Sequence, residues 1–196
     1  KGNYFHQDLL VAQKIYNNNP VRHIDIGSRI DGFVAHVAAF RKIEIFDIRP
    51  QESTANNIVF YQADLTQLQD NMRNCTDSIS SLHAIEHFGL GRYGDPIDVN
   101  GHLKAIDNIH AMLKPNGRFY FSVPIGSQRI EFNEQRVFSI EYLLRILEGK
   151  FRIDSFNYVD DNGDLFENAP LSEENIKKNF DCNWYGCGIF ELTKIN

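Results

Sequence analysis

The sequence lacks the features that mark several large classes of protein. In its 196 residues, no apolar run approaches the ~18 residues that a membrane-spanning helix needs. The opening stretch KGNYFHQDLL contains no apolar segment of the length that a secretory signal requires. The three cysteines show no C-x2-C spacing of the kind found in zinc sites. We therefore favour reduced thiols in a cytoplasmic protein.

An excess of basic side chains is also absent. The chain has 20 Lys and Arg against 26 Asp and Glu, a formal net charge of −6. Non-specific binding to nucleic acid depends on Lys and Arg that neutralise phosphates, so this balance argues against a nucleic-acid partner. The length suits one domain over residues 1–196 and leaves no room for a separate substrate-recognition domain. Nothing in the sequence indicates an oligomeric state.

Segments rich in apolar and β-branched residues alternate with segments of helical period. This alternation predicts an α/β fold with a mostly parallel sheet. A leading helix is expected within residues 1–19. The predicted strands cover residues 21–26, 43–48, 58–62, 78–82, 118–123, 151–159 and 188–194. The predicted helices cover residues 6–17, 32–40, 65–72, 101–113 and 139–147.

The segment between the last two predicted strands differs in composition from the rest. Residues 160–181 hold seven acidic side chains and two lysines. We interpret them as an acidic surface insertion with one helical turn near residues 172–179, where Ser172 is a weak candidate for the N-cap. A solvated acidic face is favoured over a functional lid.

Acidic residues end or follow three successive predicted strands. Asp25 precedes a tight turn at Gly27, where the missing Cβ permits close approach of the backbone to a ligand. The N-terminus of the next predicted helix adds free N–H groups. Twenty residues past Gly27, Asp47 ends the second strand, where a carboxylate can accept both hydroxyls of a ribose. Asp64 follows the third strand and is placed to accept a hydrogen bond from the exocyclic amine of adenine.

Taken in order, these residues resemble the motifs of class I S-adenosylmethionine-dependent methyltransferases over roughly residues 20–125. The family's first motif corresponds to residues 25–31, its fourth strand and following loop to residues 80–87, and its Leu-Lys-Pro-Asn-Gly turn to residues 113–117. The resemblance implies a Rossmann-like three-layer sandwich with a seven-stranded, mostly parallel sheet and an antiparallel last strand. It also implies the cofactor S-adenosyl-L-methionine and the product S-adenosyl-L-homocysteine. The cofactor-binding residues that it implies are Asp25, Gly27, Ser28, Arg29, Gly32, Asp47, Ile48, Asp64, Leu65, Leu82 and His83.

The first motif departs from the family at two positions. Arg29 and Asp31 stand where the family has its second and third glycines, and Gly32 comes one place late. The Arg29 side chain can crowd the amino-acid end of the cofactor, point outward, or meet the cofactor carboxylate as a charge-assisted pair. The sequence leaves these alternatives open. It also leaves open a degenerate, non-catalytic binding module that keeps the fold.

The acceptor site is expected at the carboxyl ends of the strands, beside the cofactor. His87 is the candidate general base because an unperturbed histidine titrates near neutrality, and Glu86 is its candidate catalytic partner. Alternatively, the two residues orient the loop or contact the cofactor. The candidate substrate-binding residues are Arg92, Tyr93, Arg129 and Arg136. The arginines suit an anionic acceptor, or they are ordinary surface residues.

The Glu-His pair resembles that of methyltransferases acting on quinones and glycans, so a small-molecule or sugar acceptor is expected. The Asn/Asp-Pro-Pro-Tyr/Phe signature of nucleic-acid amino methylases is absent. His83-x-x-Glu86-His87 also matches the H-x-x-E-H motif of certain zinc hydrolases, but it directly follows a predicted strand, and we expect no metal site. A dehydrogenase would also need a ribose carboxylate, yet the G-x-G-x-x-G fingerprint is missing. Four glycines within residues 89–101 predict either a lid or a plain surface loop.

Overall fold

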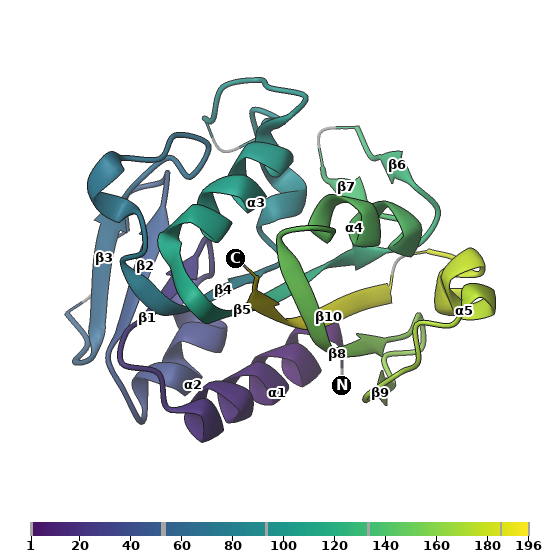
Figure 1. Cartoon of the computed structure of the whole chain (residues 1–196), viewed down its shortest axis with the longest axis horizontal. Coiled ribbons are helices and arrows are strands. Elements are labelled where there is room, and N and C mark those ends of the chain that lie inside the picture. The colour runs from purple at the N-terminus through teal and green to yellow at the C-terminus, as the bar shows by residue number, and fades with distance from the viewer. Residues whose placement is uncertain (1, 52–53, 93, 133, 185, 196) are drawn as a thin grey trace.

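The strands pair into one mixed sheet, as the computed structural model in Figure 1 shows. The model describes residues 2–51, 54–92, 94–132, 134–184 and 186–195. Within these ranges eight strands form the sheet, in the spatial order β3 (Ile58–Gln62), β2 (Ile43–Asp47), β1 (His23–Ile26), β4 (Thr76–Leu82), β5 (Leu113–Ile125), β10 (Gly186–Lys194), β8 (Phe151–Val159) and β9 (Leu165–Phe166). The first five pair in parallel, whereas β10 runs antiparallel to both of its neighbours. The predicted fold class is confirmed.

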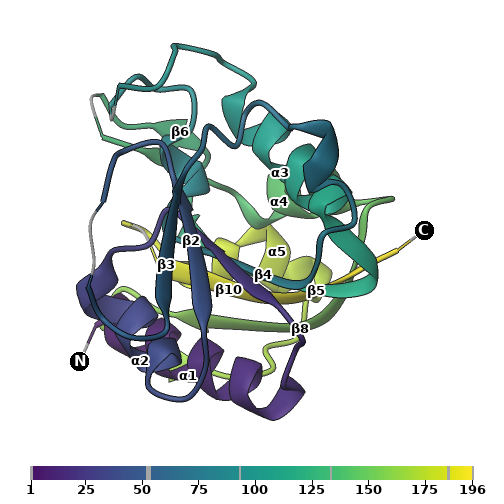
Figure 2. The ribbon, with the colours of Figure 1, turned by 90° about the vertical axis from the view of Figure 1, so that its left-hand side faces the viewer.

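Helices cover both faces of the sheet. α1 (Asn3–Asn18) and α2 (Ala35–Ala38) pack on one face, and α3 (Gly101–Met112) and α4 (Ile140–Leu147) pack on the other. The two views in Figures 1 and 2 show these helix pairs on opposite sides of the strands. The predicted leading helix is therefore one of the covering layers.

Two apolar cores lie between these layers, because successive side chains of a strand point to opposite faces. In β5, Phe119 and Phe121 pack with the α3 and α4 helices, whereas Tyr120 between them packs with α1. In β10, Phe190 packs in the core beside α3 and α4, whereas Ile189 packs in the core beside α1 and α2. Burying one such side chain contributes roughly 1.5–3 kcal/mol, so the alternation fixes which helix covers which face.

Local hydrogen bonds decide where several elements begin or fail to form. α4 follows the N-cap Ser139, the first residue of the helix predicted over 139–147, whose Oγ accepts from the Tyr142 amide at 3.2 Å. The helix predicted over residues 65–72 is wrong, since only the short turn Asp70–Met72 is helical there. The Asp64 carboxylate accepts from the amide and the hydroxyl of Thr66, and this side-chain turn replaces the first turn of a helix.

Three strands of two residues each were not predicted from the sequence. β9 adds an eighth strand to the expected seven by pairing with β8. A separate hairpin joins β6 (Arg129–Ile130) to β7 (Arg136–Val137). Strands of two residues have no readable alternation, so no periodic pattern marks them.

The acidic segment 160–181 contains β9 and α5 (Glu173–Lys177), and most of its side chains are exposed. Ser172 caps α5, with its hydroxyl accepting from the Asn175 amide at 3.3 Å. This matches the helical turn expected near residues 172–179. Among the described residues, no helix combines the length and apolarity that crossing a membrane requires.

Candidate functional site

A cavity of about 420 Å³ opens at the carboxyl ends of β1, β2, β3 and β4. Its volume lies in the range of small-molecule sites, about 300–1,000 Å³. The wall includes all but one of the residues that the sequence pattern assigned to cofactor binding, namely Gly27, Ser28, Arg29, Gly32, Asp47, Ile48, Asp64, Leu65, Leu82 and His83. The fold thus brings the turns after four different strands to one place.

The exception, Asp25, lies fully buried behind the Gly27 turn. Its carboxylate accepts hydrogen bonds from the amide and hydroxyl of Ser28, at 3.1 and 3.0 Å, and from the Ser80 hydroxyl at 2.6 Å. Burial raises the pKa of Asp25 to about 6, although these donors oppose the shift. Asp25 therefore shapes the turn and stands outside the cavity wall.

Only glycine fits at position 27. Its φ of +79° lies in the left-handed region, and a Cβ there would lie 2.7 Å from the Ala84 Cβ. The Gly27 amide donates to the Phe46 carbonyl at 3.0 Å, which ties the turn to the end of β2. The bare backbone at this turn forms part of the cavity wall.

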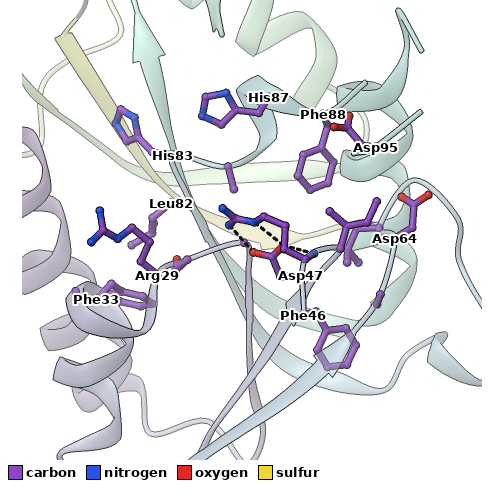
Figure 3. A pocket seen from close by; sticks show the side chains of 18 of the residues that line it. Arg29, Phe33, Phe46, Asp47, Asp64, Leu82, His83, His87, Phe88 and Asp95 are labelled. Atoms are coloured by element: carbon purple, nitrogen blue, oxygen red, sulfur yellow. Dashed lines mark hydrogen bonds and ion pairs between the residues drawn. The ribbon is translucent and has the colours of Figure 1, made fainter. Parts of the chain in front are cut away.

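Arg29 and Asp31, the two departures from the glycine motif, pair with each other. Arg29 Nε and Nη2 donate to the two carboxylate oxygens of Asp31, at 3.0 and 2.7 Å. Their side chains are 80% and 70% exposed. Figure 3 shows Arg29 at the end of the cavity opposite to Asp64. Arg29 therefore borders the cavity from its open rim.

Asp47 ends β2 with a carboxylate that is surrounded by donors from its own loop. Oδ1 accepts from the Arg49 amide at 2.8 Å and from Arg49 Nε at 3.1 Å. Oδ2 accepts from Arg49 Nη2 at 2.7 Å and from Gln51 Nε2 at 3.0 Å. Arg49 itself lines the cavity. Asp47 thus lines the cavity, and the chain already supplies four donors to its carboxylate.

The end of the cavity opposite to Arg29 has an apolar wall. Phe46, Ile48, Ala63 and Leu65 line it together with Asp64. The Asp64 carboxylate is engaged by its own turn, accepting from Thr66 as described above and from Gln67 Nε2 at 3.3 Å. A flat aromatic group would find apolar contacts here, with a carboxylate at the edge.

Glu86 and the two histidines of the segment after β4 form one cluster. The Glu86 carboxylate is fully buried and lies 3.2 Å from His83 Nδ1 and 3.9 Å from His87 Nε2. His83 Nε2 lies 3.3 Å from the Cys187 sulfur. Burial alone would lower the pKa of His83, but the Cys187 sulfur and the Glu86 carboxylate raise it well above its ordinary value. Glu86 and His83 thus form a buried ion pair beside the cavity.

His87 also lines the cavity, but its ring is neutral, unlike that of His83. Its Nδ1 lies 2.8 Å from the Glu134 carbonyl oxygen, which can only accept, so the neutral ring carries its hydrogen on Nδ1. Nε2 is left with a lone pair. Burial lowers the pKa of His87, against the opposing effect of Glu86. A neutral imidazole with a basic Nε2 suits the predicted general base.

The three arginines predicted to contact a substrate lie outside the cavity wall. Arg92 and Arg136 donate to main-chain carbonyl groups, of Glu134 in one case and of Glu86 and Phe88 in the other. Arg129 donates to the Glu131 carboxylate and to the carbonyl groups of Ser127 and Trp184. Arg136 thereby holds the turn that carries His87. Tyr93 lies outside the described residues.

The sequence pattern missed the contribution of α1 to the cavity. Tyr4, Gln7 and Asp8 line it from the first turns of this helix. Gln7 is buried and accepts from the Ser122 hydroxyl at 2.6 Å, and the Tyr4 ring lies 5.3 Å from the His83 ring. Their spacing of three and four residues places them on one helical face, but the burial of Gln7 and Asp8 is visible only in the structure. Phe88, from the segment after β4, was missed as well.

The geometry gives no support to the zinc-hydrolase alternative. Its motif requires two histidines on one face of a helix, but only Ile85–His87 is helical here, and His83 has a φ of +50°. Both rings lie close to the Glu86 carboxylate. Among the described residues, no three His, Cys, Asp or Glu side chains are grouped so as to hold a metal ion.

Comparison with solved structures shows which proteins share this fold. The N1-methyltransferase of 1,6-didemethyltoxoflavin from Burkholderia thailandensis matches with a TM-score of 0.66 and 14% identity, over 97% of this chain and 79% of that one. The N-methyltransferase NodS from Bradyrhizobium japonicum matches at 0.64 and 14%, over 97% and 86%. Both structures contain S-adenosylhomocysteine. The [4+2]-cyclase SpnF matches at 0.67 and 14%, over 96% and 80%. The chain therefore has the class I methyltransferase fold, on which more than one chemistry occurs.

Sequence comparison assigns the chain to a family of unknown function. No curated protein matches the chain. A family model described as "Caenorhabditis protein of unknown function, DUF268" matches residues 37–182. That span covers the strands from β2 to β9, including the residues around the cavity from Asp47 to His87. The chain is a member of the DUF268 family, built on the fold of the S-adenosylmethionine-dependent methyltransferases.

Proposed function

We propose that the chain binds S-adenosylmethionine in this cavity and transfers its methyl group to a small-molecule or sugar acceptor. The observation that carries the proposal is the meeting of the Gly27 turn, Asp47 and His87 around one cavity of a methyltransferase fold. The S-adenosylhomocysteine bound by two proteins of the same fold supports the choice of cofactor.

The residues present fit this cofactor at three places. The Gly27 turn, where a Cβ would strike Ala84, leaves bare backbone for the amino-acid end. Asp47 offers a carboxylate for the ribose once its present donors are exchanged. Leu65 and Ile48 offer an apolar wall for the adenine, with Asp64 at its edge. When bound, the cofactor supplies a sulfonium methyl group that a nucleophile can displace.

On this proposal His87 removes the proton of the acceptor. Its Nε2 has the lone pair, and its lowered pKa keeps the ring neutral at pH 7. When Nε2 takes up a proton, the nearby Glu86 carboxylate stabilises the imidazolium. Glu86 does not line the cavity, so it is a positioning residue that acts through His87.

The charges around the cavity favour a neutral or cationic acceptor. Five acidic side chains line the wall, namely Asp8, Asp31, Asp47, Asp64 and Asp95. The cations there are Arg29, Arg49 and the protonated His83, whose charge pairs with Glu86. The three arginines that suited an anionic acceptor donate to groups elsewhere. Hydroxyl and amine groups are therefore the acceptors to test first. The didemethyltoxoflavin bound by the Burkholderia enzyme is a precedent for a small-molecule acceptor on this fold.

Calorimetric titration with S-adenosylhomocysteine tests the cofactor proposal. We expect one binding site and a rise in melting temperature with ligand concentration. Absence of both heat and thermal shift at millimolar ligand would contradict the proposal. It would then favour the second candidate, a non-catalytic binding module, for which the occupied Asp47 carboxylate is the supporting observation.

Replacing His87 with Gln tests the base. We expect turnover to fall about 10²- to 10⁴-fold while affinity for S-adenosylhomocysteine stays unchanged. Turnover is measured as S-adenosylhomocysteine release with a panel of amines and alcohols. His110→Gln is the matched control, because His110 also has a lowered pKa and bonds a main-chain carbonyl, that of Ile195, outside the cavity.

The pH profile of kcat gives a second measurement on the same residue. His87 acts in its neutral form, and its pKa lies below the ordinary 6.5. The rate should therefore stay constant from about pH 7 to 8 and fall as the pH drops through a value below 6.5. A rate that changes only above about pH 8 would remove His87 from the mechanism.

A further inference from the structure

We propose that Arg49 occupies the ribose position of Asp47 in the ligand-free chain and must be displaced before the cofactor can bind. Arg49 is thus an affinity-setting gate within the cavity. This inference rests on the proposed function, since it concerns the same cofactor. It also bears on the choice between the two candidate functions. Occupation of Asp47 supports the non-catalytic module only if Arg49 stays in place, because a carboxylate whose partner can exchange is still able to bind the cofactor.

The acceptor capacity of Asp47 is the first step of the argument. An ionised carboxylate has about four acceptor sites. Asp47 has four donors within hydrogen-bond distance, three from Arg49 and one from Gln51. A ribose diol would bring two further hydroxyl donors. Because the acceptor sites are already filled, donors of the chain must leave before the diol can bind.

Departure of the Arg49 guanidinium frees two acceptor sites of Asp47, whereas departure of the Gln51 side chain frees only one. The Arg49 amide is fixed by the backbone, and it holds the tight turn that follows β2. The guanidinium sits on a flexible stem, its side chain is 37% exposed, and it lines the cavity. It also supplies two of the four donors, the same number that a ribose diol brings. Exchange of the guanidinium for the diol therefore keeps Asp47 fully bonded.

This exchange lowers the affinity for the cofactor. The Asp47 side chain is only 4% exposed, and its bonds to Arg49 are charge-assisted and bidentate. The hydroxyl groups that replace them are neutral donors and form weaker bonds to a carboxylate. Binding must therefore break a stronger pair than the one it forms at this position, and removal of the guanidinium should tighten binding.

Calorimetry with S-adenosylhomocysteine on Arg49 variants tests the gate. Arg49→Ala removes the competing donors, and we expect its affinity to exceed that of the unchanged chain about five- to tenfold. Arg49→Lys keeps the charge but loses the planar fork, so its affinity should fall between the two. If Arg49→Ala fails to fold, the affinity of Arg49→Lys still tests the gate. Circular dichroism checks the fold of each variant.

Two controls separate the gate from a general effect of charge. Arg152→Ala removes an arginine that pairs with the aspartate two positions further on, Asp154, outside the cavity. It should leave the affinity unchanged. In an Asp47→Ala background, Arg49→Ala should no longer tighten binding, because the group for which guanidinium and ribose compete is gone.

The outcomes separate this inference from the function on which it rests. Tighter binding by Arg49→Ala, or binding by this variant alone, supports the gate. Equal or weaker binding by Arg49→Ala, with binding by the unchanged chain, overturns the gate and leaves the proposed function standing. Tightening that persists without Asp47 also overturns it. Absence of binding by every variant overturns both.

Discussion

Two arginine–aspartate pairs border the cavity, and their surroundings differ. Arg29 pairs with Asp31 after β1, and Arg49 pairs with Asp47 after β2. In both pairs the partners are two positions apart, and Nε and Nη2 of the arginine contact the two carboxylate oxygens. The first pair is 80% and 70% exposed, whereas the second is 37% and 4% exposed. The same pair of side chains therefore lies once at the exposed rim of the cavity and once in a shielded part of its wall.

The difference shows that burial, more than the chemistry of the pair, decides its role. Exposed ion pairs contribute little because water and salt screen them. The Asp31 pair can thus open and close without consequence for the fold. Asp47 is shielded, receives a further donor from Gln51, and lies at the expected ribose position. Its pair competes with a ligand, and the predictions below test this contrast.

The largest effect should come from Gly27→Ala, which disturbs the turn that leads into the first pair and is bonded to the end of β2. The left-handed φ of +79° costs a residue with a Cβ about 1–2 kcal/mol, and the clash with Ala84 adds to this cost. We expect a lower free energy of unfolding in urea and no measurable binding of S-adenosylhomocysteine. Gly149→Ala is the matched control, since Gly149 has a φ of +72° and open space around its Cβ position. It should show the backbone cost alone and keep the binding.

A smaller effect on stability and affinity is expected for Asp47→Asn, and Asp31→Asn is its matched control. Loss of the Asp47 charge weakens the hydrogen bonds to a side chain that is only 4% exposed, which should cost about 1–3 kcal/mol of unfolding free energy. Affinity for S-adenosylhomocysteine should fall as well. Asp31→Asn changes the same charge at an exposed position and should leave both quantities unchanged. Equal effects of the two substitutions would contradict the contrast drawn here.

The smallest effect is expected for Arg29→Gln. This side chain lies at the rim and pairs only with Asp31 among the hydrogen bonds described here, so its removal should not shift the melting temperature. Affinity for S-adenosylhomocysteine should change by less than about threefold. A larger loss would show that Arg29 meets the cofactor carboxylate, the alternative that its place in the motif allows.

The sequence predicted the sheet well because several of its strands are buried on both faces and read as apolar, β-branched runs. β2 is an example, since its neighbouring side chains Ile45 and Phe46 point to opposite faces and are 0% and 4% exposed. The acidic residues that end such strands could also be placed near one another from the parallel topology alone. The two-residue strands β6, β7 and β9 could not be predicted, because their pairing depends on neighbours that the local pattern does not show.

From the sequence, only those residues of the cavity wall that lie at the carboxyl ends of the strands could be predicted. Asp47 could be found by its interval from Gly27, but nothing local indicated that Arg49 would fold back onto it. Tyr4, Gln7 and Asp8 reach the cavity from α1, whose position depends on packing against β10 and α2. Such contacts arise from tertiary packing and leave only weak traces in the sequence.

A crystal structure of the chain grown with S-adenosylhomocysteine tests the central claim most directly. The account predicts density for the ligand in the cavity, with its ribose hydroxyls on the Asp47 carboxylate and the Arg49 guanidinium displaced from it. The amide of Arg49 should keep its bond to Asp47. A bound ligand with the guanidinium still paired to Asp47, or a ligand seated outside this cavity, would contradict the account.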